Sequence, residues 1–113
     1  MFAVHYGLDS LTAIVDWNGY QSDGASKDVM GNSRLPLSWK GFGWNVIEID
    51  GHSFDEINGA FSAPRIEGVP TVIIARTIKG KGISFMENNN AWHHNRLTEE
   101  SYHRSINEIN ENV

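Results

Sequence analysis

Three short runs rich in apolar and β-branched residues set the fold class of this chain. They occupy residues 11–16, 46–50 and 71–77. Near-continuous apolar runs of this length predict strands that are buried on both faces, as in parallel sheets. Helical patterns lie between them at residues 35–42 and 54–62. Because strands alternate with helices, we expect an α/β fold with a parallel sheet of about three strands and flanking helices.

The expected helices carry recognisable end signals. Ser53 and Glu56 match the capping box Ser-x-x-Glu, in which each side chain satisfies an amide of the first turn. Gly43 is expected to end the helix at residues 35–42 in a left-handed conformation. A last helix is expected to begin at Thr98, with an apolar stripe formed by Tyr102, Ile106, Ile109 and Val113.

Length, charge and composition exclude several classes of protein. The 113 residues suit one domain, and the net charge of -5 without a basic block disfavours nucleic-acid binding. Charged residues interrupt every apolar run before the roughly 18 residues of a membrane span, and no signal peptide precedes the first strand. We therefore expect a soluble, cytoplasmic protein. The absence of Cys excludes disulfides, zinc-thiolate sites and a cysteine nucleophile.

The beginning of the chain and its tryptophans suggest an incomplete domain. Residues 1–8 have the pattern of the end of a helix, without a start signal before them. A sheet of about three parallel strands with so few helices would leave apolar faces uncovered. Residues 1–113 are thus expected to form a single incomplete domain that assembles with itself or with another chain, covering the large apolar area of Trp17, Trp39, Trp44 and Trp92.

Candidate ligand-binding residues follow the first expected strand. Ligands of parallel α/β sheets bind beyond the carboxyl ends of the strands. Asn18 could offer its side-chain oxygen and Tyr20 its main-chain oxygen, and both are hard ligands that suit Mg²⁺ or Ca²⁺. By spacing alone, an ordinary turn at Asn18 and Gly19 is the simpler interpretation.

Two further segments allow alternative interpretations. Residues 79–82, Lys-Gly-Lys-Gly, could cradle a phosphate or could form a flexible, solvated strand exit. His93 could act as a general acid or base, or it could be a surface loop histidine. His94 is not expected to share a metal with it, because adjacent side chains diverge. The polar segments 21–34 and 87–96 are either functional loops or disordered ones.

Three blocks in this order carry a family resemblance. They are residues 11–21, Leu-Thr-Ala-Ile-Val-Asp-Trp-Asn-Gly-Tyr-Gln; residues 42–52, Phe-Gly-Trp-Asn-Val-Ile-Glu-Ile-Asp-Gly-His; and residues 70–82, Pro-Thr-Val-Ile-Ile-Ala-Arg-Thr-Ile-Lys-Gly-Lys-Gly. The chain resembles the thiamine-diphosphate-binding domain of transketolases, especially the N-terminal chain of split bacterial forms. The resemblance covers essentially all of the sequence and implies a partial thiamine-diphosphate-binding fold.

The resemblance implies roles for four residues. Asn18 and the main-chain oxygen of Tyr20 would hold the Mg²⁺ that binds the cofactor diphosphate. Ser22 would line the cofactor pocket. His93, as the catalytic residue, would approach both the diphosphate and the reacting substrate.

The sequence also departs from the family pattern. His94 stands where Gly usually follows the histidine, Tyr20 where Leu or Ile is usual, and Ser22 where an apolar residue packs near the thiazolium ring. Ser22 should therefore weaken cofactor packing modestly. The family's Gly-Asp-Gly motif, which supplies an aspartate ligand to Mg²⁺, is absent from the residues before Asn18. The pyrimidine-binding domain and its glutamate are absent as well.

The resemblance therefore implies part of a thiamine-diphosphate- and Mg²⁺-dependent transketolase. Such an enzyme moves a two-carbon ketol unit from a ketose phosphate to an aldose phosphate, as in the pentose phosphate pathway. The missing N-terminal segment, a pyrimidine-domain chain and sugar phosphates would be its partners, and the isolated chain is expected to be inactive. Two alternatives remain: a non-catalytic remnant or interaction module with the same fold, and an unrelated α/β nucleotide-binding module.

Overall fold

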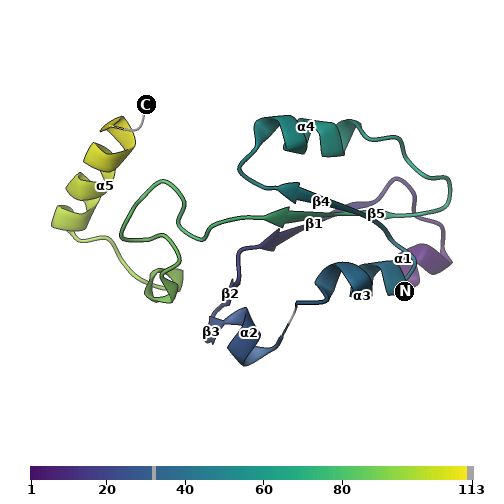
Figure 1. Ribbon diagram of the computed structural model, residues 1–113, viewed down its shortest axis with the longest axis horizontal. Helices are drawn as coiled ribbons and strands as arrows, with labels where there is room; N and C mark the ends of the chain where they lie inside the picture. The colour runs from purple at the N-terminus through teal and green to yellow at the C-terminus, as the bar shows by residue number, and fades with distance from the viewer. Residues whose placement is uncertain (32, 112–113) are drawn as a thin grey trace. The chain divides into compact units, whose positions relative to one another are not determined.

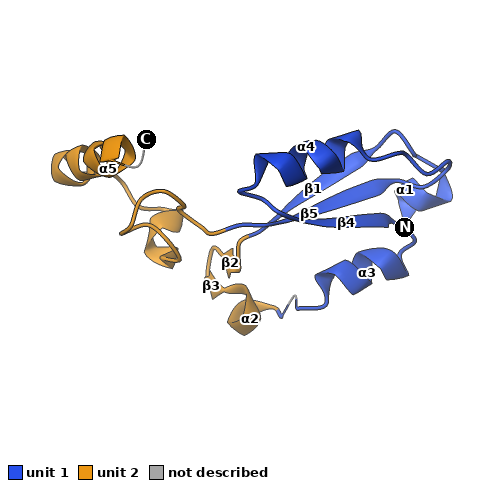
Figure 2. Cartoon of the chain, turned by 45° about the horizontal axis from the view of Figure 1, so that its top comes forward, with its two compact units in different colours: residues 1–17, 31–77 blue, residues 18–30, 78–113 orange. Residues whose placement is uncertain are grey.

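The computed structural model describes residues 1–31 and 33–111, which form two compact units. Unit 1 contains residues 1–17 and 31–77, and unit 2 contains residues 18–30 and 78–113 (Figure 2). No helix among the described residues is long and apolar enough to span a membrane.

Unit 1 is built on a parallel three-stranded sheet. Its strands are β1 (Thr12–Trp17), β4 (Asn45–Asp50) and β5 (Thr71–Arg76), in the order β1-β5-β4 (Figure 1). All three predicted strands are confirmed, and so is the α/β class. The central strand β5 is buried from its first to its fifth residue, and the side chains of Val72 and Ile74 are 0% exposed.

The prediction that the first strand is buried on both faces is wrong for this chain. Exposed and half-buried residues alternate along β1, and Ile14 is 60% exposed. β1 forms the edge of the sheet, so it has a neighbouring strand on one side only. Ile14 is in register with the buried Ile73 of β5. It is exposed because the helix α4 (Phe54–Ser62) packs on β4, at the other edge of the sheet. An apolar run alone therefore does not distinguish a central strand from an edge strand.

Helices pack on both faces of the sheet, against β4. Helix α4 lies on one face and α3 (Leu35–Gly41) on the other (Figure 1). The buried cluster of unit 1 lies under α4, where Ala60 meets strand residues from β4 and β5. Helix α1 (Phe2–His5) begins without a side-chain cap. Gly43 follows α3 with the expected positive φ, +85°.

The capping box at α4 forms only in part. The Ser53 hydroxyl accepts a hydrogen bond from Glu56 N at 3.3 Å, as predicted. The Glu56 carboxylate, however, accepts from Asp50 N at 2.7 Å rather than from Ser53 N, which donates to Asp50 O. The turn after β4 is tight and brings Asp50, the last residue of the strand, close to Glu56. The Glu56 carboxylate therefore bonds to Asp50 N and closes the turn.

Unit 2 contains short elements and one longer helix. Strands β2 (Tyr20–Gln21) and β3 (Gly24–Ala25) pair antiparallel and are followed by α2 (Ser26–Val29). The second stretch holds the 3₁₀ helix η1 (Asn90–His93) and α5 (Glu99–Glu111). Both polar segments therefore contain regular elements within the described residues.

Helix α5 begins where predicted but packs through a different face. Its buried or half-buried residues are polar: Ser101, Ser105 and Glu108. The predicted apolar stripe is exposed, at 50% for Tyr102, 39% for Ile106 and 43% for Ile109, and Val113 lies outside the described residues. Polar contacts attach this helix to the rest of unit 2, at Ser84.

Candidate functional site

Asn18 and Gly19 form a tight turn directly after β1. Asn18 Oδ1 accepts a hydrogen bond from Tyr20 N at 2.9 Å, and Gly19 has a φ of +81°. Gly19 O accepts from Ser26 N at 2.8 Å, which closes the hairpin of β2 and β3. The turn interpretation is thus correct for the backbone. The same turn holds the Asn18 amide oxygen close to the Tyr20 main chain.

Tyr20 contacts a distant part of unit 2 through its side chain. Its hydroxyl donates a hydrogen bond to Asn88 O at 2.6 Å, across 68 residues of sequence. Asn88 has a φ of +52° and is the only residue other than glycine with a positive φ among the described residues. The aromatic side chain therefore reaches the segment that leads into η1.

Ser22 and His93 are brought together by the same arrangement. Ser22 Oγ lies 3.0 Å from His93 Nε2, although 71 positions separate the two residues. His93 is the last residue of η1, whose start is capped by Asn89 Oδ1 accepting from Ala91 N at 3.1 Å. Both Ser22 and His93 are exposed. The four predicted site residues all belong to unit 2, and the hairpin that carries three of them touches the segment that carries the fourth.

Asn90 adds a third contact between the two segments. In the amide orientation that gives both the nitrogen and the oxygen a hydrogen-bond partner, Asn90 Nδ2 donates to Gln21 O at 3.0 Å and Asn90 Oδ1 accepts from Gly24 N at 3.2 Å. The sequence predicts only a polar segment over residues 87–96 and gives no sign of this role. A side-chain contact to a distant backbone leaves no periodic signal in the sequence.

The Lys-Gly-Lys-Gly segment contacts the side chain of Glu87 and is not a flexible loop after the strand. Glu87 Oε1 accepts from Gly82 N at 3.0 Å and lies 3.7 Å from Lys81 Nζ. Gly80 has a φ of +73°, and a Cβ there would lie 2.5 Å from Met86 O. These donors already face a carboxylate of the chain, so a phosphate bound here would compete with Glu87.

A polar cluster holds α5 against the same segment. Glu108 accepts from Ser84 N at 2.6 Å and from Arg104 Nε at 2.9 Å. The Arg104 guanidinium also lies over the Phe85 ring, 4.5 Å from its centroid. The hydrogen bond from the Ser84 main chain, followed by the one from its hydroxyl, lowers the pKa of Glu108 below its ordinary value.

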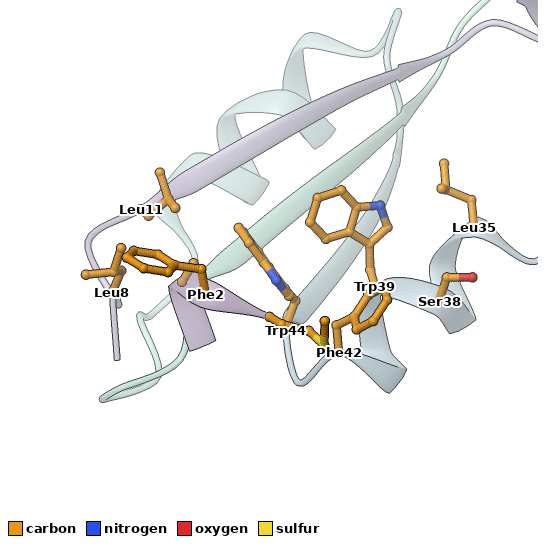
Figure 3. Close-up of a pocket in the computed structure, with 10 residues that line it drawn as sticks. Phe2, Leu8, Leu11, Leu35, Ser38, Trp39, Phe42 and Trp44 are labelled. Carbon is orange, nitrogen blue, oxygen red and sulfur yellow. The ribbon is translucent and has the colours of Figure 1, made fainter. Parts of the chain in front are cut away.

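The four tryptophans all have ring contacts inside the chain. Arg76 lies over Trp17 at 4.2 Å, Trp39 meets Trp44 edge to face at 4.7 Å, and Trp92 lies 5.2 Å from Phe85. An apolar groove of about 620 Å³ nevertheless opens in unit 1 (Figure 3). Side chains of α1, α3 and the flanking loops line it, among them Phe2, Leu11, Leu35, Trp39, Phe42 and Trp44.

The oxygen donors of the hairpin suit part of a magnesium site. The Asn18 side-chain oxygen and a main-chain oxygen are neutral and hard, as Mg²⁺ requires. Among residues 1–31 and 33–111, no group of three or more His, Cys, Asp and Glu side chains could hold a metal ion. The hairpin therefore offers neutral ligands, and a carboxylate is still needed to balance the charge.

The profile of the family "Transketolase, thiamine diphosphate binding domain" matches residues 1–109. This chain belongs to that family. It is 43% identical over 110 residues to the 6-deoxy-6-sulfo-D-fructose transketolase subunit SqwG of Clostridium sp. strain MSTE9, covering 96% of this chain and 40% of that protein. It is 37% identical over 109 residues to an apulose-4-phosphate transketolase subunit of Phocaeicola vulgatus, covering 96% of this chain and 39% of that protein.

Solved transketolase structures share the fold of this family member. The crystal structure of transketolase from Campylobacter jejuni superposes with a TM-score of 0.82 at 26% identity, covering 96% of this chain and 17% of that one. The resemblance to transketolase N-terminal subunits is confirmed. The chain spans about 40% of the length of the curated subunits it matches.

Proposed function

We propose that this chain supplies the metal-diphosphate side of the thiamine diphosphate site in a transketolase. The observation that carries the proposal is the contact between the two segments of unit 2. The hairpin with Asn18 and Tyr20 is hydrogen-bonded to the segment with His93, in a chain that belongs to a thiamine diphosphate binding family. The residues that we propose as metal ligands and the His93 imidazole belong to one compact unit, which supports the proposal.

Each residue has a definite role in this proposal. Asn18 Oδ1 and the main-chain oxygen of Tyr20 are ligands of Mg²⁺. His93 donates a hydrogen bond to an oxygen of the diphosphate or of the substrate, and Ser22 lines the pocket beside it. The cofactor, when bound, supplies the carbanion-stabilising chemistry that breaks a carbon-carbon bond. The protein binds, orients and shields the reacting groups.

The reaction proposed is transfer of a two-carbon ketol unit from a ketose phosphate to an aldose phosphate. It is supported by the names of the relatives, which are subunits of a 6-deoxy-6-sulfo-D-fructose transketolase and of an apulose-4-phosphate transketolase. The first name gives a sulfonated sugar and only the second gives a sugar phosphate, so the names support transfer between sugars as a class, and the phosphate group stays a prediction. A place in the pentose phosphate pathway and a cytoplasmic location stay predictions.

We further propose that residues 1–113 are inactive alone and belong to one domain that is completed by other polypeptide. The match covers only about 40% of each relative, and both relatives are named as subunits. The proposed partners are a segment that supplies the carboxylate ligand of Mg²⁺ and a chain that supplies the pyrimidine-binding domain. Assembly with these partners, or with a second copy, would also cover the apolar groove of unit 1.

Paramagnetic NMR with Mn²⁺ in place of Mg²⁺ tests the metal site even if binding is weak. We expect Mn²⁺ with thiamine diphosphate to broaden the resonances of Asn18, Tyr20 and His93 before those of unit 1. Asn18→Ala should abolish this preference, because it removes the side-chain ligand. Asn58→Ala is the matched control, since Asn58 is an exposed residue of α4 that also precedes a glycine. Equal broadening in the two variants would contradict the proposed metal site.

A non-catalytic interaction module is the second candidate function. It is favoured by the lack of a group of three or more potential metal-binding side chains among the described residues. Such a module would show no selective broadening with thiamine diphosphate at any concentration tested. The same titration with ATP addresses the nucleotide-binding alternative, which predicts broadening with ATP and Mn²⁺ in preference to thiamine diphosphate.

A further inference from the structure

The side chains of Tyr20 and Ser22 on the hairpin both contact the segment that carries His93. Here the Tyr20 hydroxyl donates to Asn88 O at 2.6 Å, and Ser22 Oγ lies 3.0 Å from His93 Nε2. Both polar groups on the hairpin are thus used within the chain.

We propose that Ser22 and Tyr20 are positioning residues that fix the His93 imidazole on the metal-binding hairpin. Ser22 sets the rotation of the ring and the nitrogen that carries its proton, and Tyr20 holds the backbone that leads to it. The meaning of this arrangement for catalysis rests on the proposed function. The arrangement itself is a property of unit 2 and is measurable without cofactor.

The bond from Ser22 determines how His93 presents its ring. A neutral imidazole has one donor and one acceptor nitrogen. In the proposed arrangement the Ser22 hydroxyl donates to Nε2, so Nδ1 carries the proton and is the nitrogen left to donate to a ligand. The hydroxyl therefore couples the tautomer to the orientation of the ring, which an apolar side chain at position 22 could not do.

The bond from Tyr20 supports the backbone before η1. Asn88 has a φ of +52°, a conformation that residues other than glycine adopt at some energetic cost. The Tyr20 hydroxyl fixes the carbonyl oxygen of that residue. Asn90, bonded to the hairpin at Gln21 and Gly24, holds the next turn. Three contacts along residues 88–93 thus fix the segment to one hairpin.

The Ser22 contact is tested by nitrogen-15 NMR of the histidine rings in the cofactor-free chain, at a pH where they are neutral. Ser22→Ala should change the tautomer ratio of His93 by about two- to tenfold, the size expected for the loss of one exposed hydrogen bond. Ser22→Thr should restore it, because the hydroxyl returns. Ser62→Ala, at the end of α4, is the matched control, and the rings of His52 and His103 serve as internal references.

The Tyr20 contact is tested by amide hydrogen exchange. Tyr20→Phe keeps the main-chain oxygen but removes the hydroxyl, so exchange at Asn88 N, which donates to Lys79 O at 2.9 Å, should quicken about two- to tenfold. The matched control is Tyr102→Phe on the exposed face of α5. An unchanged His93 tautomer ratio in Ser22→Ala, or unchanged Asn88 exchange in Tyr20→Phe, would overturn the corresponding assignment.

These outcomes are separable from the failure of the proposed function. If Ser22→Ala alters the His93 ring while Mn²⁺ with thiamine diphosphate broadens nothing selectively, the positioning of His93 stands and the cofactor site does not. If the broadening is selective but the tautomer ratio of His93 is unchanged in Ser22→Ala, the cofactor site stands and Ser22 is not a positioning residue. The amide resonances of α5, in the same unit but away from the hairpin, report whether each variant keeps the fold of unit 2.

Discussion

Glu108 on α5 accepts hydrogen bonds from both the main-chain nitrogen and the hydroxyl of Ser84, at 2.6 and 2.9 Å. Arg104, one turn earlier on the helix, donates to the same carboxylate. The helix exposes its apolar stripe and is held against Ser84 and Phe85 by two charged side chains, Glu108 and Arg104.

The attachment of α5 should depend on pH. Because its hydrogen bonds lower the pKa of Glu108 in the folded chain, the ionised form stabilises the fold at every pH above its ordinary value. That contribution is lost as the pH falls through the lowered pKa. We expect amide exchange in α5 to quicken over this acidic range, measured by NMR. Glu108→Gln should show fast exchange already at pH 7, whereas Glu111→Gln, at the end of α5, should behave like the unmodified chain.

Gly80 should not tolerate a side chain. A Cβ there would lie 2.5 Å from Met86 O, and its φ is +73°. We expect Gly80→Ala to lower the free energy of unfolding of unit 2 by about 1–3 kcal/mol. The control is Gly59→Ala in α4, where a Cβ meets nothing within 4 Å. That variant should instead gain about 0.5–1 kcal/mol from helix propensity, measured by urea unfolding. Equal effects of the two substitutions would contradict the close contact at Gly80.

The centre and the edge of the sheet should respond differently to the same truncation. Ile73 on β5 is 2% exposed, and Ile14, its registered neighbour on β1, is 60% exposed. Ile73→Ala should lower the free energy of unfolding by about 2–5 kcal/mol, because it leaves a cavity. Ile14→Ala should have a clearly smaller effect in the isolated chain. Similar losses in thermal unfolding would mean that β1 is covered in solution.

The groove of unit 1 should bind apolar dyes. Its lining includes Phe42, which is 51% exposed. We expect a naphthalene-sulfonate dye to become fluorescent with this chain and Phe42→Ser to reduce the signal. Phe54→Ser is the control, because Phe54 is 81% exposed but lies on α4, outside the groove. Loss of signal in the control alone would place the dye elsewhere.

The sequence predicts the strands and helices well because their patterns are local. The run at residues 71–77 indicates a strand whichever neighbours it has, and Gly43 indicates a helix end through its own conformation. The position of β1 at the edge depends on strand order, which no local pattern records. The partner of Glu56 likewise depends on how tightly the chain turns after Asp50.

The residues of the candidate site were named from family motifs, and their roles stay predictions. Asn18, Tyr20, Ser22 and His93 could be named from the resemblance, and all four lie in unit 2. The contacts among them could not be predicted. Asn88 contacts the hairpin through its main-chain carbonyl, and Asn90 contacts it through its side-chain amide. The hairpin is far from both residues in sequence. Such contacts carry no periodicity and arise only when the tertiary fold brings the segments together.

The register of β1 and β5 has a consequence for the order in which this chain acquires its structure. Trp17 and Arg76 are paired at the ends of adjacent strands, so the two stretches of unit 2 leave the sheet from neighbouring positions. Once that pairing exists, the loop that must close to join Tyr20 to Asn88 shrinks from the whole stretch 20–88 to the stretches 17–20 and 76–88. Part of the entropy lost in closing the hairpin onto the His93 segment is thus already lost when the strands pair. Sheet formation should come first in folding, and substitutions that slow strand pairing should delay formation of the site by the same factor.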